Sequence, residues 1–111
     1  MKDPVSGVFA ALADPTRRSI YEKLLVEANG RNATEIARAA EVSRQAIVKH
    51  LQVLVKAGLA SSQRDGREVR YLADESGISE ATEWFARSSA AWDRRIDALR
   101  HRVNTRSGQK P

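Results

Sequence analysis

The sequence predicts a mainly α-helical fold with one β-hairpin, and three observations indicate it. Residues 32–59 contain two short amphipathic segments with a corner between them, the pattern of a helix-turn-helix. Within residues 60–72, Asp65-Gly66 lies between two runs of extended pattern, which is a strong hairpin signal. A long apolar stripe at helical spacing then occupies residues 79–103. A helix-turn-helix followed directly by a hairpin is the layout of a winged helix.

Length and composition restrict the class of protein. With 111 residues, the chain is expected to form one domain over residues 1–111. It has no cysteine, which excludes disulfides, thiolate metal sites and thiol catalysis. No apolar run approaches the roughly 20 residues that span a bilayer, and the N-terminus lacks the pattern of a signal peptide. We therefore expect a cytoplasmic protein without membrane contact.

The net charge of +5 is concentrated in one part of the chain. Residues 31–72 hold eight basic and four acidic side chains, whereas the segments on either side are nearly balanced. A basic excess focused on one segment is expected of a face that binds phosphates. The alternative is a solvated surface that is basic by chance, and charge alone does not separate the two.

The first two helices are predicted from their ends. Ser6 can cap a short helix that ends at Ala13, and Asp14 can cap the next helix with Pro15 at its first position. Gly30, after Asn29, is expected to end this second helix. Its buried stripe is expected to comprise Ile20, Tyr21, Leu24 and Leu25.

The helix-turn-helix of residues 32–59 is also predicted from its end signals. Asn32 and Glu35 have the spacing of a capping box at the start of its first helix. Ser43 is expected to cap the second helix, and Gly58 to end it. The inward face of the second helix is expected to comprise Ile47, Leu51, Leu54 and Val55.

The other face of this second helix carries the predicted DNA-reading residues, which are Arg44, Gln45, Val48, Lys49 and Gln52. They lie near the helix N-terminus, where a docked helix reaches base edges in the major groove. Arginine can pair with guanine, glutamine with adenine, and an aliphatic side chain can meet a thymine methyl. Ser43 and the first amides of the helix could hold a phosphate. The alternative is an ordinary amphipathic helix with a polar solvent face.

Three arginines, Arg64, Arg67 and Arg70, cluster near the predicted hairpin tip. A basic wing can press on phosphates or enter the minor groove, where arginine is favoured by the negative potential. The charges could also keep a solvent-exposed strand edge from aggregating. The two interpretations are compatible.

The final helix carries one stripe whose members recur at steps of 4, 4, 4, 3 and 4: Trp84, Ser88, Trp92, Ile96, Leu99 and Val103. Phe85 widens this stripe. We expect it to form a dimer interface with Phe9 from the N-terminal helix, and Trp92 to be an anchor. The alternatives are packing within the same chain and an aromatic cofactor pocket. Residues 104–111 are polar and basic and are expected to be a disordered tail.

Three separated blocks resemble the ArsR family of winged-helix repressors. They are residues 9–18 (FAALADPTRR), residues 48–59 with Val-Lys-His-Leu and Ala-Gly-Leu at their ends, and residues 65–67 (DGR). The resemblance implies a homodimeric cytoplasmic repressor that binds an inverted-repeat operator in double-stranded DNA. His50 matches the family's Lys-His-Leu block, which implies a phosphate contact or a capping role. The final helix is similar to that of a metal-independent branch.

The departures from the family concern metals and specificity. Family metal sensors carry cysteines in the first helix of the helix-turn-helix, and this chain has none. His101 follows Asp97 by four residues, so the two side chains could be ligands on one helix face. A zinc site usually has four ligands, so we predict neither a metal nor another cofactor. At Gln45 many relatives have proline, and at Val48 a small hydroxyl residue. The operator therefore does not follow from the relatives.

The sequence thus favours a dimeric DNA-binding regulator over two other functions. The first is a winged-helix protein-interaction module that uses its aromatic C-terminal helix. The second is an enzyme, which we rank lowest because no nucleophile–base pair, glycine-rich phosphate loop or carboxylate constellation is present. We therefore predict no catalytic residue, and no motif indicates a small-molecule inducer.

Overall fold

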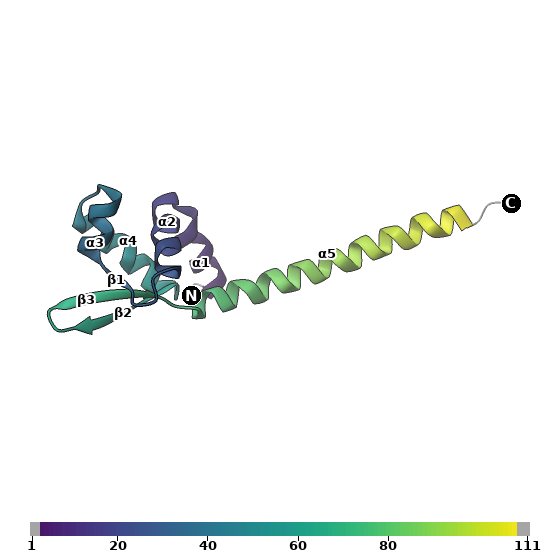
Figure 1. The fold of residues 1–111 in the computed structure, drawn as a ribbon. Coiled ribbons are helices and arrows are strands. Elements are labelled where there is room, and N and C mark those ends of the chain that lie inside the picture. Colours follow the sequence, from purple (N-terminus) through teal and green to yellow (C-terminus); the bar gives the residue numbers. More distant parts are fainter. Residues whose placement is uncertain (1–2, 109–111) are drawn as a thin grey trace. The chain divides into compact units, whose positions relative to one another are not determined.

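The computed structural model describes residues 3–108, which divide into one unit that ends at Ala81 and a second that begins at Thr82. The elements are α1 (Pro4–Ala13), α2 (Pro15–Leu25), β1 (Arg31–Asn32), α3 (Ala33–Ala40), α4 (Arg44–Lys56), β2 (Ala60–Asp65), β3 (Glu68–Ala73) and α5 (Ser76–Gly108) (Figure 1). The first unit contains everything up to the first turns of α5, and the second is the remainder of that helix. The predicted mainly helical fold with a hairpin wing is confirmed.

The starts of α1 and α2 are both fixed by aspartate caps. The Asp3 carboxylate accepts a hydrogen bond from the Ser6 amide at 2.9 Å, so the prediction that Ser6 caps α1 is wrong. An aspartate followed by proline is the stronger signal, because proline fits the first helical position without losing a bond. The predicted cap of α2 is confirmed. The Asp14 carboxylate accepts from the amides of Thr16 at 2.8 Å and Arg17 at 3.1 Å.

Asp14 makes the stability of α2 sensitive to acid. The hydrogen bond from the Arg17 amide, with help from the Thr16 amide and the charges of Arg17 and His50, lowers the pKa of Asp14 below 3.8. A carboxyl group whose pKa is lower in the folded state than in the unfolded state stabilises the fold at pH values above its unfolded-state pKa. This stabilisation is lost as the pH falls through its folded-state pKa. Asp14→Asn keeps a capping oxygen but does not titrate. In thermal unfolding, the wild type should therefore lose more stability than Asp14→Asn between neutral pH and about pH 3. Parallel losses would contradict this role.

Helix α2 ends earlier than predicted. It stops at Leu25, and the chain continues through a loop to Gly30, which has a φ of 74°. Leu25 is 57% exposed, so its predicted place in the buried stripe is wrong. It lies about 100° around the helix from Leu24, which is fully buried.

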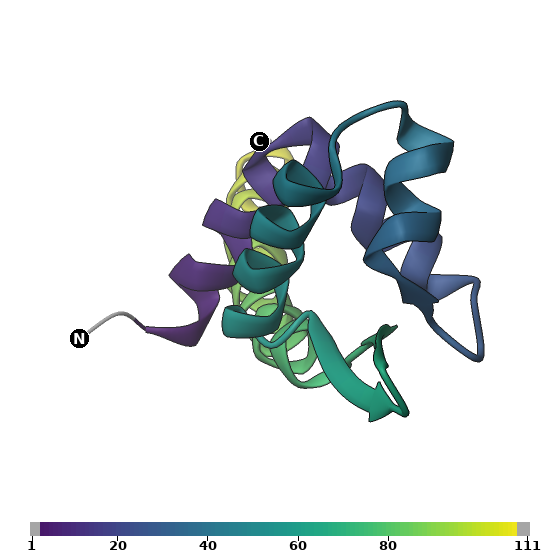
Figure 2. The ribbon, with the colours of Figure 1, turned by 90° about the vertical axis from the view of Figure 1, so that its left-hand side faces the viewer.

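The two helices of the helix-turn-helix lie beside each other, and the hairpin begins at the end of α4 (Figure 2). The predicted capping box is present: the Glu35 amide donates to Asn32 Oδ1 at 2.8 Å, and the Asn32 amide to Glu35 Oε1 at 3.1 Å. Ser43 caps α4 as predicted, since its Oγ accepts from the Ala46 amide at 3.2 Å. Between the helices, Glu41 adopts the left-handed conformation with a φ of 56°. This single residue makes the corner.

The core of the first unit lies where α4 packs against the other helices. Its fully buried side chains are Val8, Ile20, Leu24, Ile36, Ile47, Leu51, Leu54 and Leu59. The predicted inward face of α4 is confirmed at Ile47, Leu51 and Leu54. It is wrong at Val55, which is exposed because it lies about 100° around the helix from Leu54.

The hairpin turns one residue later than its sequence signal suggests. Asp65 pairs with Glu68, so the two-residue loop is Gly66-Arg67. Gly66 has a φ of 64° and Arg67 has no positive φ, as in a type II′ turn. No pattern in the sequence predicts β1, which pairs with β3 and makes a three-stranded antiparallel sheet in the order β1-β3-β2.

Helix α5 begins against the end of α4. The Gly77 amide donates to the Gly58 carbonyl oxygen at 2.8 Å, and a Cβ on Gly77 would lie 2.5 Å from the Ala57 oxygen. Only glycine permits this approach. The helix continues to Gly108, so residues 104–108 of the predicted tail are helical, and residues 109–111 lie outside the described residues. Within residues 3–108, no helix has the length and apolarity needed to cross a bilayer.

Candidate nucleic-acid interface

The polar face of α4 is open to solvent. Arg44, Gln45, Lys49 and Gln52 are all exposed, and Ser43 is exposed at the helix start. Four side chains that can bond to bases or phosphates therefore point away from the core. Val48 differs, because it is half-buried and packs against the core cluster. Val48 therefore forms an apolar edge of this face and does not project from it as the four polar side chains do.

A groove of about 460 Å³ separates α4 from the wing. Arg44 and Val48 line it from α4, and Arg67, Glu68, Val69 and Tyr71 line it from the wing. Residues at the start of α3 also line it. Within residues 3–108, neither the Arg44 nor the Arg67 guanidinium has a hydrogen bond or ion pair with the protein. The two sides of the groove therefore each present a cation with free donors.

The three wing arginines do not form one cluster. Arg64 pairs with Val69 and Gln63 pairs with Arg70, so Arg64 and Arg70 lie on opposite faces of the sheet. Arg67 is in the exposed turn and Arg64 is exposed on β2. The Arg70 guanidinium instead donates to the carbonyl oxygens of the loop before β1. That placement favours a structural role for Arg70.

His50 is half-buried on α4, and its charge is one of the causes that lower the pKa of Asp14, behind the hydrogen bond from Arg17. It therefore lies near the cap of α2. The imidazole makes no hydrogen bond within residues 3–108, so the phosphate contact and the capping role that the family resemblance implies both stay predictions.

The second unit presents the predicted apolar stripe. Trp84, Phe85, Trp92, Ile96, Leu99 and Val103 are 40–61% exposed, and Phe9 on α1 is 38% exposed. The rings of Trp84 and Phe85 meet edge to face at 5.2 Å between centroids, and the Arg95 guanidinium lies 5.3 Å from the Trp92 ring centroid.

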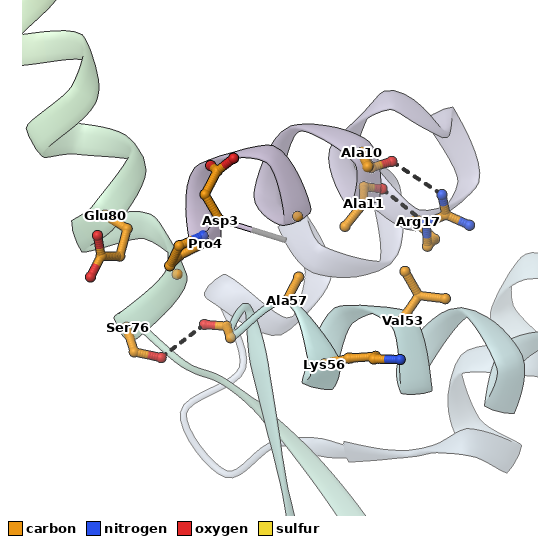
Figure 3. Close-up of a pocket in the computed structure, with 13 residues that line it drawn as sticks. Asp3, Pro4, Ala10, Ala11, Arg17, Val53, Lys56, Ala57, Ser76 and Glu80 are labelled. Atoms are coloured by element: carbon orange, nitrogen blue, oxygen red, sulfur yellow. Dashed lines mark hydrogen bonds between the residues drawn. The ribbon is translucent and has the colours of Figure 1, made fainter. Parts of the chain in front are cut away.

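A second hollow, of about 760 Å³, lies in the first unit beside the start of α1 and the end of α4. Figure 3 shows Arg17 donating to the carbonyl oxygens of Ala10 and Ala11, which satisfies the C-terminal end of α1. Its four charged residues are Asp3, Arg17, Lys56 and Glu80. These charges are balanced, so the hollow is not complementary to a polyanion.

Asp97 and His101 both lie on α5, as the sequence implies. Within the described part of the chain, no three or more histidine, cysteine, aspartate or glutamate side chains are grouped so that they could hold a metal ion.

Comparison with known proteins identifies the family. A family model described as a helix-turn-helix domain matches residues 12–63. The chain is 30% identical over 81 residues to the transcriptional repressor SdpR of Bacillus subtilis, covering 73% of this chain and 88% of that protein. It is 39% identical to the solved structure of an ArsR-like transcriptional regulator from Rhodococcus, with a TM-score of 0.74 and coverage of 88% and 91%.

A further solved structure bears on assembly. A possible ArsR-family regulator from Mycobacterium bovis, described as a homodimeric winged helix-turn-helix DNA-binding domain, is 25% identical with a TM-score of 0.61. The match covers 86% of this chain and 84% of that one. With α4, the wing and the sequence relationships in agreement, this chain belongs to the ArsR family and is a DNA-binding transcriptional regulator.

Proposed function

We propose that the protein is a homodimeric repressor that binds an inverted-repeat operator through α4 and the wing of each copy. The observation that carries this proposal is the groove between α4 and the wing, with unpaired Arg44 and Arg67 on its two sides. A DNA strand that passes between a helix in the major groove and a wing on the adjacent backbone would meet both cations. Repression is inferred from the B. subtilis relative, which is named a repressor.

In this proposal, sequence is read by Arg44, Gln45, Lys49 and Gln52, since these side chains are exposed on α4. Arginine and glutamine supply the bidentate donors and acceptors that distinguish bases in the major groove. Val48 lines the groove and can meet a thymine methyl only if the duplex comes close to the helix N-terminus. Ser43 and the first amides of α4 are available to a phosphate.

Arg67 is proposed to contact a phosphate from the wing. Arg67→Ala should weaken binding about equally on specific and random duplexes and should reduce the slope of log affinity against log salt by about one. Fluorescence anisotropy over a salt series measures this slope. Arg87→Gln is the matched control, because it removes one positive charge from an exposed site on α5. An unchanged slope in Arg67→Ala would remove Arg67 from the interface.

The dimer is proposed to form through the α5 stripe with Phe9 of α1. Support comes from the exposure of this stripe and from the M. bovis relative, which is described as homodimeric. A two-fold dimer would present two α4 helices to half-sites about one helical turn apart. We also propose that the protein acts in the cytoplasm, where such an operator is accessible.

Selection of bound sequences from a random duplex pool tests the proposal. The expected product is a palindromic motif whose half-sites are about 10 base pairs apart from centre to centre. A motif without two-fold symmetry would contradict the dimeric mode of binding. Absence of any enriched sequence at low salt would contradict operator binding itself.

A further inference from the structure

Arg70 is the most heavily bonded side chain of the wing. Its Nε donates to the Asn29 carbonyl oxygen at 3.0 Å, and its Nη2 donates to the Gly30 oxygen at 2.8 Å. Its Nη1 lies 3.2 Å from Glu68 Oε2 and 3.8 Å from Glu35 Oε1. One guanidinium therefore joins β3, the loop before β1 and the first turn of α3.

The carboxylates beside Arg70 extend this connection into the helix-turn-helix. Asn32 Nδ2 donates to the second oxygen of Glu68, while the Asn32 side chain also caps α3 together with Glu35. The wing is thus bonded to the same residue that starts the first helix of the helix-turn-helix. A shift of the wing would break the hydrogen bond between Asn32 and Glu68 or leave the guanidinium without its acceptors.

Charge argues against DNA as the partner of Arg70. Its single positive charge lies beside two carboxylates, Glu35 and Glu68, so the local sum is negative. A phosphate approaching this site would be repelled by the carboxylates and would compete with acceptors already in place. Arg44 and Arg67 differ, because neither has a carboxylate partner within the described residues.

The backbone supports the same contact. Gly30 has a φ of 74°, and a Cβ there would lie 2.5 Å from the Tyr71 carbonyl oxygen. The loop before β1 can therefore approach β3 closely only with glycine at this position. This approach brings the carbonyl oxygens of Asn29 and Gly30 to the Arg70 guanidinium.

We propose that Arg70 is a positioning residue that fixes the wing against the start of α3, and that it does not itself contact DNA. The clamp, defined as Arg70 with Glu68, Glu35 and Asn32, acts at the base of the wing, whereas Arg67 lies at the tip. A two-stranded ribbon is marginal by itself. The clamp and β1 therefore set where Arg67 stands relative to α4. This inference rests on the proposed function, because a fixed wing matters only if the wing meets DNA.

The test compares Arg70→Gln, Arg67→Ala and the double variant in binding to the selected duplex. Arg70→Gln should lower both the affinity and the salt slope about as much as Arg67→Ala does, because the Arg67 phosphate contact is lost in both variants. In the double variant the two losses should not add, because Arg67 has little left to contribute once the wing is free. Arg70→Lys should not restore binding, since one ammonium cannot bridge two carbonyls and two carboxylates.

Hydrogen exchange without DNA tests the clamp by itself. Arg70→Gln should raise the exchange rates of amides in β1 and β3 above wild type, and those in the buried middle of α4 should stay unchanged. Glu68→Gln gives the same readout with a smaller perturbation, should Arg70→Gln fold poorly. If the wild type prefers no sequence, the proposed function fails, and the exchange result still decides whether the clamp holds the wing.

Two outcomes would overturn the inference. Losses of affinity and of salt slope that add in the double variant, with a slope about two below the wild type, would show that Arg70 makes a phosphate contact of its own. Unchanged exchange of the β1 and β3 amides in both Arg70→Gln and Glu68→Gln would show that the wing does not depend on the clamp.

Discussion

Replacing Trp92 with alanine is expected to shift the protein from dimer to monomer and to abolish operator binding at concentrations where the wild type binds. The indole is 58% exposed on α5, in the middle of the apolar stripe. Truncation of a central tryptophan in an interface typically costs about 2 kcal/mol or more, and a symmetric dimer loses the side chain twice. At 1.4 kcal/mol per tenfold, the dimer dissociation constant should rise by roughly 10³. Sedimentation velocity over a dilution series measures it.

Arg94→Gln is the matched control for Trp92→Ala. Arg94 lies two residues further on and therefore about 200° around the helix from Trp92. Alanine is a strong helix former, so circular dichroism should show that Trp92→Ala keeps its helix content. If Trp92→Ala sedimented as the wild type does at low concentration, Trp92 would not be an anchor of the dimer.

The second large effect is expected at Arg44. Arg44→Ala should weaken binding to the selected operator by about 1–3 kcal/mol if the guanidinium reads a base. Binding to random duplex should change far less, because that binding depends on phosphates. The relevant quantity is the ratio of the two affinities at one salt concentration, measured by competition.

Arg44→Lys separates charge from geometry. Lysine keeps the positive charge but lacks the planar fork that pairs bidentately with guanine. It should therefore preserve binding to random duplex and lose much of the preference for the operator. If Arg44→Ala lowered both affinities equally, Arg44 would be a phosphate contact and the reading face would begin at Gln45.

Much of the fold could be predicted because its boundaries are set by local chemistry. The capping box of Asn32 and Glu35, the Ser43 cap and the Asp14-Pro15 start each satisfy backbone amides within three residues, so they can be read directly from the chain. The buried positions of α4 follow in the same way from its helical spacing. The hairpin was predicted from Asp65-Gly66, although the pairing places its loop one residue later.

The features that could not be predicted depend on contacts distant in sequence. Strand β1 has two residues and exists because β3 pairs with it, so it has no periodicity of its own. In the sequence alone, nothing distinguishes Arg70 from the other two arginines of the wing. Its acceptors, the carbonyl oxygens of Asn29 and Gly30, lie about forty positions earlier. The helical spacing also led to the wrong prediction that Leu25 and Val55 are buried. Each follows a buried leucine in the sequence, and tertiary packing decides which of the two neighbours faces the core.

Because the strands of the wing are joined by the two-residue turn at Gly66-Arg67, the wing can lengthen only by whole residue pairs, one residue in each strand. Each residue added to both strands would lengthen the wing by about 3.4 Å, roughly the rise of one base pair. A single addition per strand would also move every side chain beyond it to the opposite face, whereas two additions would restore the facing. In the proposed mode of binding, the reach of the wing along DNA would therefore change in steps of about two base pairs.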